Sequence, residues 1–151
     1  MDYPFLLYGI GLAAAMVAAS MTVTAFPDWR LARAAVVVFA NWVIGTVFVL
    51  VSGVTDAWWF NIAIDAVAAA AILYRLSTHW QAALGLTYCL QIAMHIAYAL
   101  LTAKGGAVPL PYYGALTAIA WLQLVMVGGW SGDVWLRRSA EAAAGKAEPK
   151  A

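Results

Sequence analysis

The sequence predicts an all-α integral membrane bundle of five transmembrane helices. Of its 151 residues, 66% are hydrophobic and 10% are charged, whereas soluble domains are about 45–50% apolar and about 25% charged. The mean hydropathy is +0.85, and a soluble fold of this length could not bury so much apolar surface. Polar connectors divide the chain into apolar stretches about long enough to cross a ~30 Å hydrocarbon core as helices. The expected spans are 4–26, 33–51, 57–76, 80–102 and 111–130.

The composition excludes several classes of protein. A formal net charge of +1 leaves no basic patch for nucleic acid, so we expect no nucleic-acid partner. Cys89 is the single cysteine, so neither an intrachain disulfide nor a Cys₄ metal site can form. We expect one transmembrane domain over 1–135 and a short polar cytoplasmic tail over 136–151.

The first two spans are separated by a turn that contains proline. The first segment begins without the basic residues of a signal peptide, so we interpret 4–26 as a retained helix. Gly11, Ala15 and Ala19 share one face of it, which indicates either close helix packing in lipid or plain alanine-rich composition. The second span, 33–51, ends at a polar turn that contains glycine.

The last three spans have similar boundaries. Two tryptophans at the start of 57–76 are typical of the membrane interface. A Ser-Thr-His turn precedes 80–102, and a connector rich in glycine and proline, which cannot be helical throughout, precedes 111–130. A Ser-Gly-Asp run closes the fifth span, and we expect the tail, 136–151, to be loosely ordered.

Charged connectors predict the orientation. With five spans, nearly all basic residues fall on one side, which makes the C-terminus cytoplasmic and places the N-terminus outside. We expect a bacterial inner (cytoplasmic) membrane, with the lipid bilayer as the immediate partner. The basic side carries Arg30, Arg33, Arg75, Arg137, Arg138, Lys146 and Lys150, and the opposite side carries Asp2, Asp56 and Lys104.

Polar side chains inside the spans form one predicted layer. At 1.5 Å of rise per residue, Asp65 lies roughly 12 Å and His95 roughly 10 Å from the outer edge, on antiparallel neighbours. Asn41, Gln91 and Gln123 fall somewhat deeper, at roughly 15–18 Å. The candidate intramembrane site consists of Asp65, His95, Asn61, Gln91, Asn41, Tyr98 and Gln123.

Helical spacing places these side chains on shared faces. Asn61 and Asp65 lie four residues apart on the third span. The fourth span carries a stripe with 3-4-3-4 spacing that consists of Tyr88, Gln91, His95, Tyr98 and Thr102. A polar stripe on an apolar span should face other helices or a cavity and not lipid.

Asp65 and His95 support a functional interpretation. A charged side chain at the centre of a spanning helix costs ~2.5–3.5 kcal/mol on insertion scales. Burial opposes charge on both groups, whereas their mutual attraction favours it, so the pair could relay protons. The structural alternative, that the polar layer only holds the helices together through hydrogen bonds, stays open.

The sequence predicts no cofactor, metal site or catalytic residue. His79 and His95 lie at opposite membrane faces, so they cannot both ligate one haem. Asp65 and His95 are too few ligands for a metal site. No serine accompanies His95, Cys89 lies off its face, and no phosphate-binding loop occurs, so an enzyme has the weakest support.

The favoured function is a small proton-coupled transporter, channel or proton-conducting subunit with an intramembrane Asp–His pair. Two alternatives stay open: a non-catalytic accessory or assembly subunit of a larger membrane complex, and a phage-type holin or other pore-forming protein. The stripe of small residues permits a homo-oligomer without requiring one.

Overall fold

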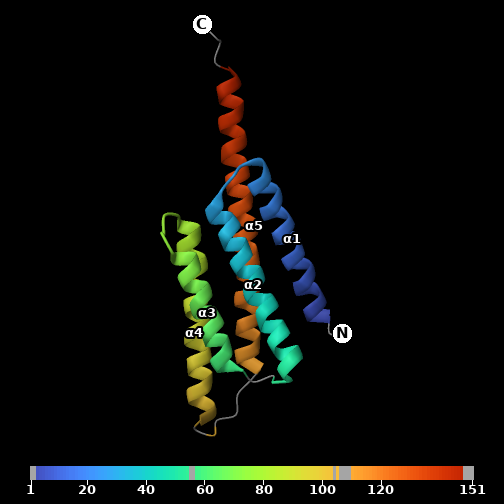
Figure 1. Ribbon diagram of the computed structural model, residues 1–151, viewed down its shortest axis with the longest axis vertical. Coiled ribbons are helices and arrows are strands. Elements are labelled where there is room, and N and C mark those ends of the chain that lie inside the picture. Colours follow the sequence, from blue (N-terminus) through green and yellow to red (C-terminus); the bar gives the residue numbers. More distant parts are fainter. Residues whose placement is uncertain (1–2, 55–56, 104, 106–109, 148–151) are drawn as a thin grey trace.

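The computed structural model describes residues 3–54, 57–103, 105 and 110–147, which form a bundle of α-helices (Figure 1). The helices are α1 (Tyr3–Ala25), α2 (Trp29–Ser52), α3 (Trp58–Leu73), α4 (His79–Ala103) and α5 (Leu110–Ala147). All but α3 are long and apolar enough to cross a membrane. The 16 residues of α3 extend over about 24 Å. The predicted all-α class is confirmed, and four of the helices have the length of a full span.

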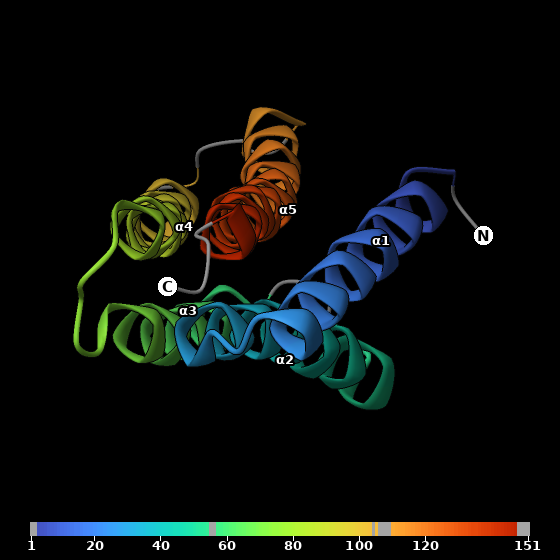
Figure 2. The ribbon, with the colours of Figure 1, turned by 90° about the horizontal axis from the view of Figure 1, so that it is seen from above.

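The helices follow one another around a ring, as the view from above shows (Figure 2). Each helix packs on the next, α5 packs back on α1, and the contact between α3 and α4 is the most extensive. Successive helices run in opposite directions, so the α1–α2 and α3–α4 turns lie at one end (Figure 1). We call the half of the bundle near these turns the closed half, and the half in which α1 begins the open half.

The packed core lies in the closed half. Its largest fully buried side chains are Trp130, Tyr88, Leu31, Ile72 and Leu84. Large apolar side chains also cover the outside of the bundle, where Val67 is 70% and Val51 is 82% exposed. An outward-facing apolar surface suits lipid, and tight van der Waals packing is what holds helices together there.

α2 begins before residue 33, where the second span was expected to start. Asp28 stands in the N-cap position and accepts hydrogen bonds from the backbone N–H groups of Arg30 (2.9 Å) and Leu31 (3.1 Å). These bonds satisfy two of the N–H groups that a helix start leaves without partners. Residues 29–32 therefore form the first turn of the helix.

α3 is shorter than the expected span, 57–76. Arg33 of α2 donates a hydrogen bond to the backbone carbonyl of Tyr74 (2.7 Å), and Gln81 of α4 donates one to that of Ile72 (3.1 Å). Side chains of the neighbouring helices thus satisfy carbonyls at the end of α3, which can stop without a further helical turn.

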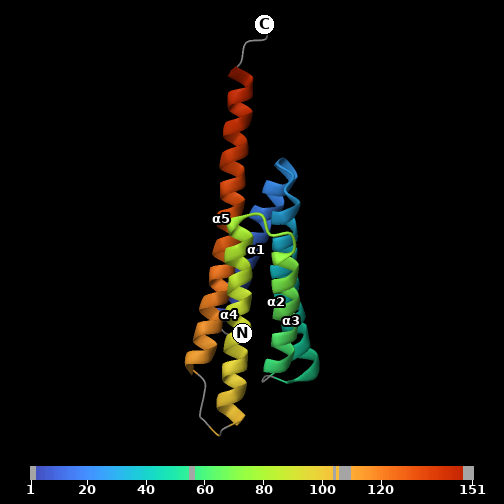
Figure 3. The same cartoon turned by 90° about the vertical axis from the view of Figure 1, so that its left-hand side faces the viewer.

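α5 continues beyond the expected span, 111–130, as far as Ala147, so the expectation of a loosely ordered tail over 136–151 is wrong for the described part. Arg137 pairs with Asp133 at 2.8 Å, one turn earlier. Alanine, glutamate, arginine and lysine dominate this stretch and favour helix, which outweighs the glycine of the Ser-Gly-Asp run. The end of α5 stands clear of the other helices (Figure 3).

Two glycine sites show how closely the helices approach. A Cβ atom on Gly11 would lie 2.7 Å from a tryptophan ring of α5, and one on Gly85 would overlap the side chain of Leu73. Ala15 and Ala19 are buried. The stripe of small residues on α1 is therefore a packing face and not only alanine-rich composition.

Gly85→Ala should lower the thermal stability of the purified protein in detergent. Overpacking costs about 1–3 kcal/mol, which exceeds the roughly 1 kcal/mol that alanine gains over glycine in a helix. Gly128→Ala is the matched control, because a Cβ atom there has open space. A Gly85→Ala variant at least as stable as Gly128→Ala would contradict close packing of α3 on α4.

Candidate functional site: a polar cavity in the open half

The open half contains a cavity of about 880 Å³ that side chains from all of the described helices line. This volume falls in the range of about 300–1,000 Å³ that is typical of ligand sites. Val38 belongs both to the cavity wall and to the packed core, so the cavity ends where the core begins. Its polar lining consists of Tyr8, Asn41, Thr46, Asn61, Asp65, Gln91, His95, Thr117 and Gln123.

Asp65 on α3 and His95 on α4 face each other in this wall. Nε2 of His95 lies 3.2 Å from Oδ2 of Asp65, and the two side chains are 3% and 4% exposed. Small residues bring the two helices together, because Ala68, Ala69 and Gly85 are all buried. The expected contact between the carboxylate and the imidazole is therefore present.

Two further side chains extend the pair into a chain across the bundle. Nδ2 of Asn41 on α2 donates a hydrogen bond to Oδ1 of Asp65 at 3.0 Å. Nδ1 of His95 lies 2.5 Å from the hydroxyl oxygen of Tyr112 on α5. The chain Asn41–Asp65–His95–Tyr112 thus joins four helices. It also offers neighbouring positions for a proton on Asp65, on His95 and on the phenol.

The remaining oxygen of Asp65 is incompletely satisfied. Oδ2 is buried and lies within ion-pair distance of His95, yet among the described residues no group donates a hydrogen bond to it. A buried carboxylate oxygen without a hydrogen bond is unfavourable. It therefore calls for a proton on the carboxylate, a charge on the imidazole, or a ligand in the cavity.

The glutamines of the predicted layer form a second, neutral group. Nε2 of Gln123 on α5 donates to Oε1 of Gln91 on α4 (2.6 Å) and to Oγ1 of Thr87 (3.1 Å). These hydrogen bonds tie α4 to α5. The layer that the sequence predicts is thus divided into an ionisable chain and a neutral network, and both reach the cavity.

The other two predicted residues differ in their positions. Asn61 lines the cavity one helical turn from Asp65. Tyr98 is buried and is not among the lining residues. Its ring stacks on that of Tyr112, with centroids 4.3 Å apart. Tyr98 therefore supports the phenol that contacts His95 and does not face the cavity.

Tyr112 is the member of the site that the sequence did not indicate. It stands in the first turn of α5, where a tyrosine suits a membrane interface. The available signal was its spacing from Gln123, since 123 − 112 = 11 residues is about three helical turns. Both side chains therefore lie on the face of α5 that looks toward α4.

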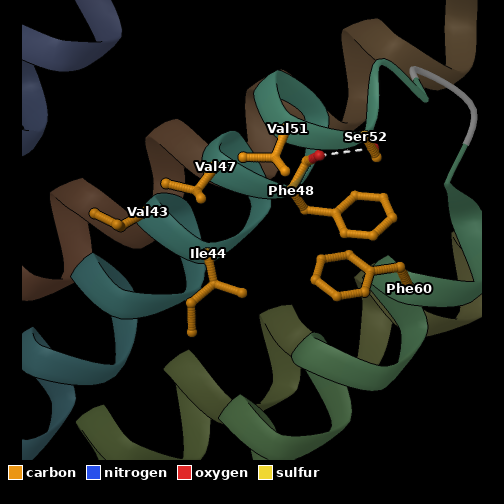
Figure 4. A pocket seen from close by; sticks show the side chains of 7 residues that line it. All are labelled: Val43, Ile44, Val47, Phe48, Val51, Ser52 and Phe60. Atoms are coloured by element: carbon orange, nitrogen blue, oxygen red, sulfur yellow. Dashed lines mark hydrogen bonds between the residues drawn. The ribbon is translucent and has the colours of Figure 1, made fainter.

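A second hollow, of about 520 Å³, lies on the outside of the α2–α3 pair (Figure 4). It is lined by Val43, Ile44, Val47, Phe48, Val51, Ser52 and Phe60. The rings of Phe48 and Phe60 stack with centroids 3.9 Å apart, and the Ser52 hydroxyl donates to the Phe48 carbonyl. This surface is apolar and offers no ionisable group, so we place the candidate site in the first cavity.

No protein-family model, curated protein sequence or solved structure matches the chain. Among the residues that the structure describes, no three His, Cys, Asp or Glu side chains gather as metal ligands. Cys89 is exposed on α4, away from the cavity lining. The function is therefore inferred from the geometry of the cavity itself.

Tyr112→Phe should change the ¹⁵N chemical shift of His95 Nδ1, because it removes the hydroxyl group that contacts this nitrogen. It should also destabilise the protein by about 1–3 kcal/mol, the cost of an unsatisfied buried group. His79 provides an internal reference signal, and Tyr113→Phe, at an exposed neighbouring tyrosine, is the matched control. Equal His95 shifts in the wild type and Tyr112→Phe would show that the contact does not form.

Thr46→Cys should react with a membrane-impermeant thiol reagent in liposomes, because Thr46 lines the cavity. The background is Cys89→Ser, so that the new thiol is the only one. Leu84→Cys, at a fully buried position of the closed half, should react at least about tenfold more slowly, since a thiol in a packed core is inaccessible to water. Comparable rates at both positions would contradict a cavity confined to the open half.

Proposed function

We propose that this protein is a proton-coupled membrane carrier that binds a small solute in the cavity of the open half. The Asp65–His95 pair exchanges a proton when the solute binds. The observation that supports this most directly is the buried 3.2 Å contact between the two groups in the wall of a cavity large enough for a ligand. Ionisable side chains inside a membrane are functional candidates by default.

The distribution of packing favours a carrier over an open channel. The cavity stops at Val38, and beyond it Leu31, Ile72, Leu84 and Val127 are almost fully buried. A continuous pore would need a polar path through this core. A carrier instead exposes its site to one side at a time and opens the other side by a conformational change.

We propose a five-span arrangement in a bacterial inner membrane, with the N-terminus outside and the C-terminus in the cytoplasm. Arg33, Arg137 and Arg138 lie toward the end at which α5 emerges, which supports a cytoplasmic closed half by the positive-inside rule. Asp2, Asp56, Lys104 and Lys150, which also entered this prediction, lie outside the described residues. A short α3 is compatible with spanning if the bilayer thins locally or interfacial side chains extend its reach.

Proteoliposomes that contain a pH-sensitive dye test the carrier. Benzyltrimethylammonium, benzenesulfonate, glycine and xylitol represent a cation, an anion, a zwitterion and a neutral solute. At least one of them should move protons across the membrane with the wild type. Asp65→Asn should reduce this rate by at least about tenfold, because the amide cannot take up a proton. Glu141→Gln removes an exposed carboxylate on α5 and should leave the rate unchanged.

The same measurement separates the alternatives. A holin-like pore would leak protons before any solute is added. An accessory subunit would show neither a leak nor a response to solute, and its polar layer would serve helix packing only. Lack of a response to all four solutes, or equal rates for the wild type and Asp65→Asn, would overturn the carrier.

A further inference from the structure

The charged groups of the described cavity lining favour a positively charged ligand. Asp65 can carry a negative charge, and no lysine or arginine is among the described lining residues, so His95 is the only basic side chain there. An anionic ligand would meet the carboxylate without a fixed positive partner. A cationic ligand would meet a carboxylate in the cavity wall whose oxygen Oδ2 receives no hydrogen bond from the described residues.

The charge balance of the site links the binding of a cation at Oδ2 of Asp65 to the loss of one proton. With a single proton shared by Asp65 and His95, the pair is neutral as a whole, whether the carboxyl or the imidazole holds it. Loss of that proton would leave an uncompensated carboxylate in a low-dielectric site, which is strongly unfavourable. A monovalent cation next to Oδ2 restores neutrality, so its binding and the proton's departure favour each other.

The remaining walls suit an organic cation better than a bare metal ion. Val49, Leu50, Ile64 and Leu116 present apolar surface to the cavity. The rings of Tyr8 and Trp42 also line it, with centroids 6.1 Å apart. Aromatic faces attract ammonium and other organic cations, and apolar walls favour substituents that a hydrated metal ion lacks.

We infer that the cavity binds a lipophilic monovalent organic cation at Asp65, and that this cation replaces the one proton held by Asp65 and His95. The proton leaves through the open half to water. This assignment rests on the proposed carrier and names its substrate class. It makes the exchange one cation for one proton, so the charge inside the bilayer stays the same throughout.

Other titratable groups lie near Asp65 and His95, but they do not alter the charge of the pair. Tyr88 on α4 interacts electrostatically with Asp65, Tyr112 on α5 contacts His95, and Tyr8 on α1 lines the cavity. A phenol is neutral at physiological pH. On α2, the neighbour of the carboxylate is the neutral amide of Asn41. The exchangeable proton therefore belongs to Asp65 and His95.

Tetraphenylphosphonium and tetraphenylborate test this assignment, because they share one shape and carry opposite charges. Equilibrium dialysis of the full chain in detergent measures binding, and a pH electrode in weak buffer measures proton release. The wild type should bind the phosphonium ion and release about one proton per cation. Asp65→Asn should weaken phosphonium binding by about tenfold or more, given the strength of a buried charge contact. Glu141→Gln should bind like the wild type.

A second pair of variants tests the assignment even if Asp65→Asn fails to fold. Asn61 lines the same cavity, so Asn61→Asp should strengthen phosphonium binding and Asn61→Lys should weaken it. Tetraphenylborate binding as tight as tetraphenylphosphonium binding would overturn the cation site. So would tetraphenylphosphonium binding that neither Asn61 variant changes. Binding that depends on Asp65 without transport in proteoliposomes would leave the cation site standing and refute the carrier. Proton movement driven only by neutral or anionic solutes would support the carrier and refute the cation site.

Discussion

The need to accommodate one carboxylate inside an apolar helix organises this bundle. Asp65 stands in the middle of α3, a helix whose other residues, apart from Asn61, are apolar or aromatic. In that setting the charge must be paired, protonated or hydrated. Asn41 and His95 supply a hydrogen bond and an ion-pair contact from two other helices, and Tyr112 supports the imidazole from a fourth. The contacts of this one side chain and of its partner His95 thus connect α2, α3, α4 and α5 in the open half.

The two halves of the bundle differ in how their side chains pack. In the closed half, small residues and large apolar side chains interlock, and Gln81 and Arg33 satisfy carbonyls at the end of α3. This packing leaves little freedom to move. In the open half polar side chains line a cavity, and among the described residues Oδ2 of Asp65 receives no hydrogen bond, so a water molecule or a ligand there would satisfy it. The packed core and the cavity with its ionisable groups thus lie in different halves of the bundle.

Periodicity predicted which faces of α3 and α4 turn inward, but not how the inward faces meet. The stripe on α4 is buried at Tyr88, His95 and Tyr98, because side chains at alternating three- and four-residue spacing lie above one another on any regular helix. The separation of Gln91 and Gln123 from the ionisable pair depends on helix rotation and tilt, which spacing along the chain does not encode. The end of α5 was missed because the Ser-Gly-Asp run resembles a turn, whereas in the fold Asp133 binds Trp80 and Arg137 within a continuous helix. Local composition thus predicted that the helix ends at the Ser-Gly-Asp run. Tertiary contacts and helix propensity instead allow α5 to continue through it.

The chain through Asn41, Asp65, His95 and Tyr112 also provides a physical basis for a change of conformation. Each protonation state of the pair gives different attractions between α3 and α4, and a cation at Oδ2 would weaken the hold of the carboxylate on the imidazole. Because Asn41 and Tyr112 connect the same pair to α2 and α5, a change at one oxygen alters the forces between four helices at once. A ligand shifts a conformational equilibrium only through such a difference between states. The pair at which we propose that the solute binds is therefore also the element best placed to change the structure around it.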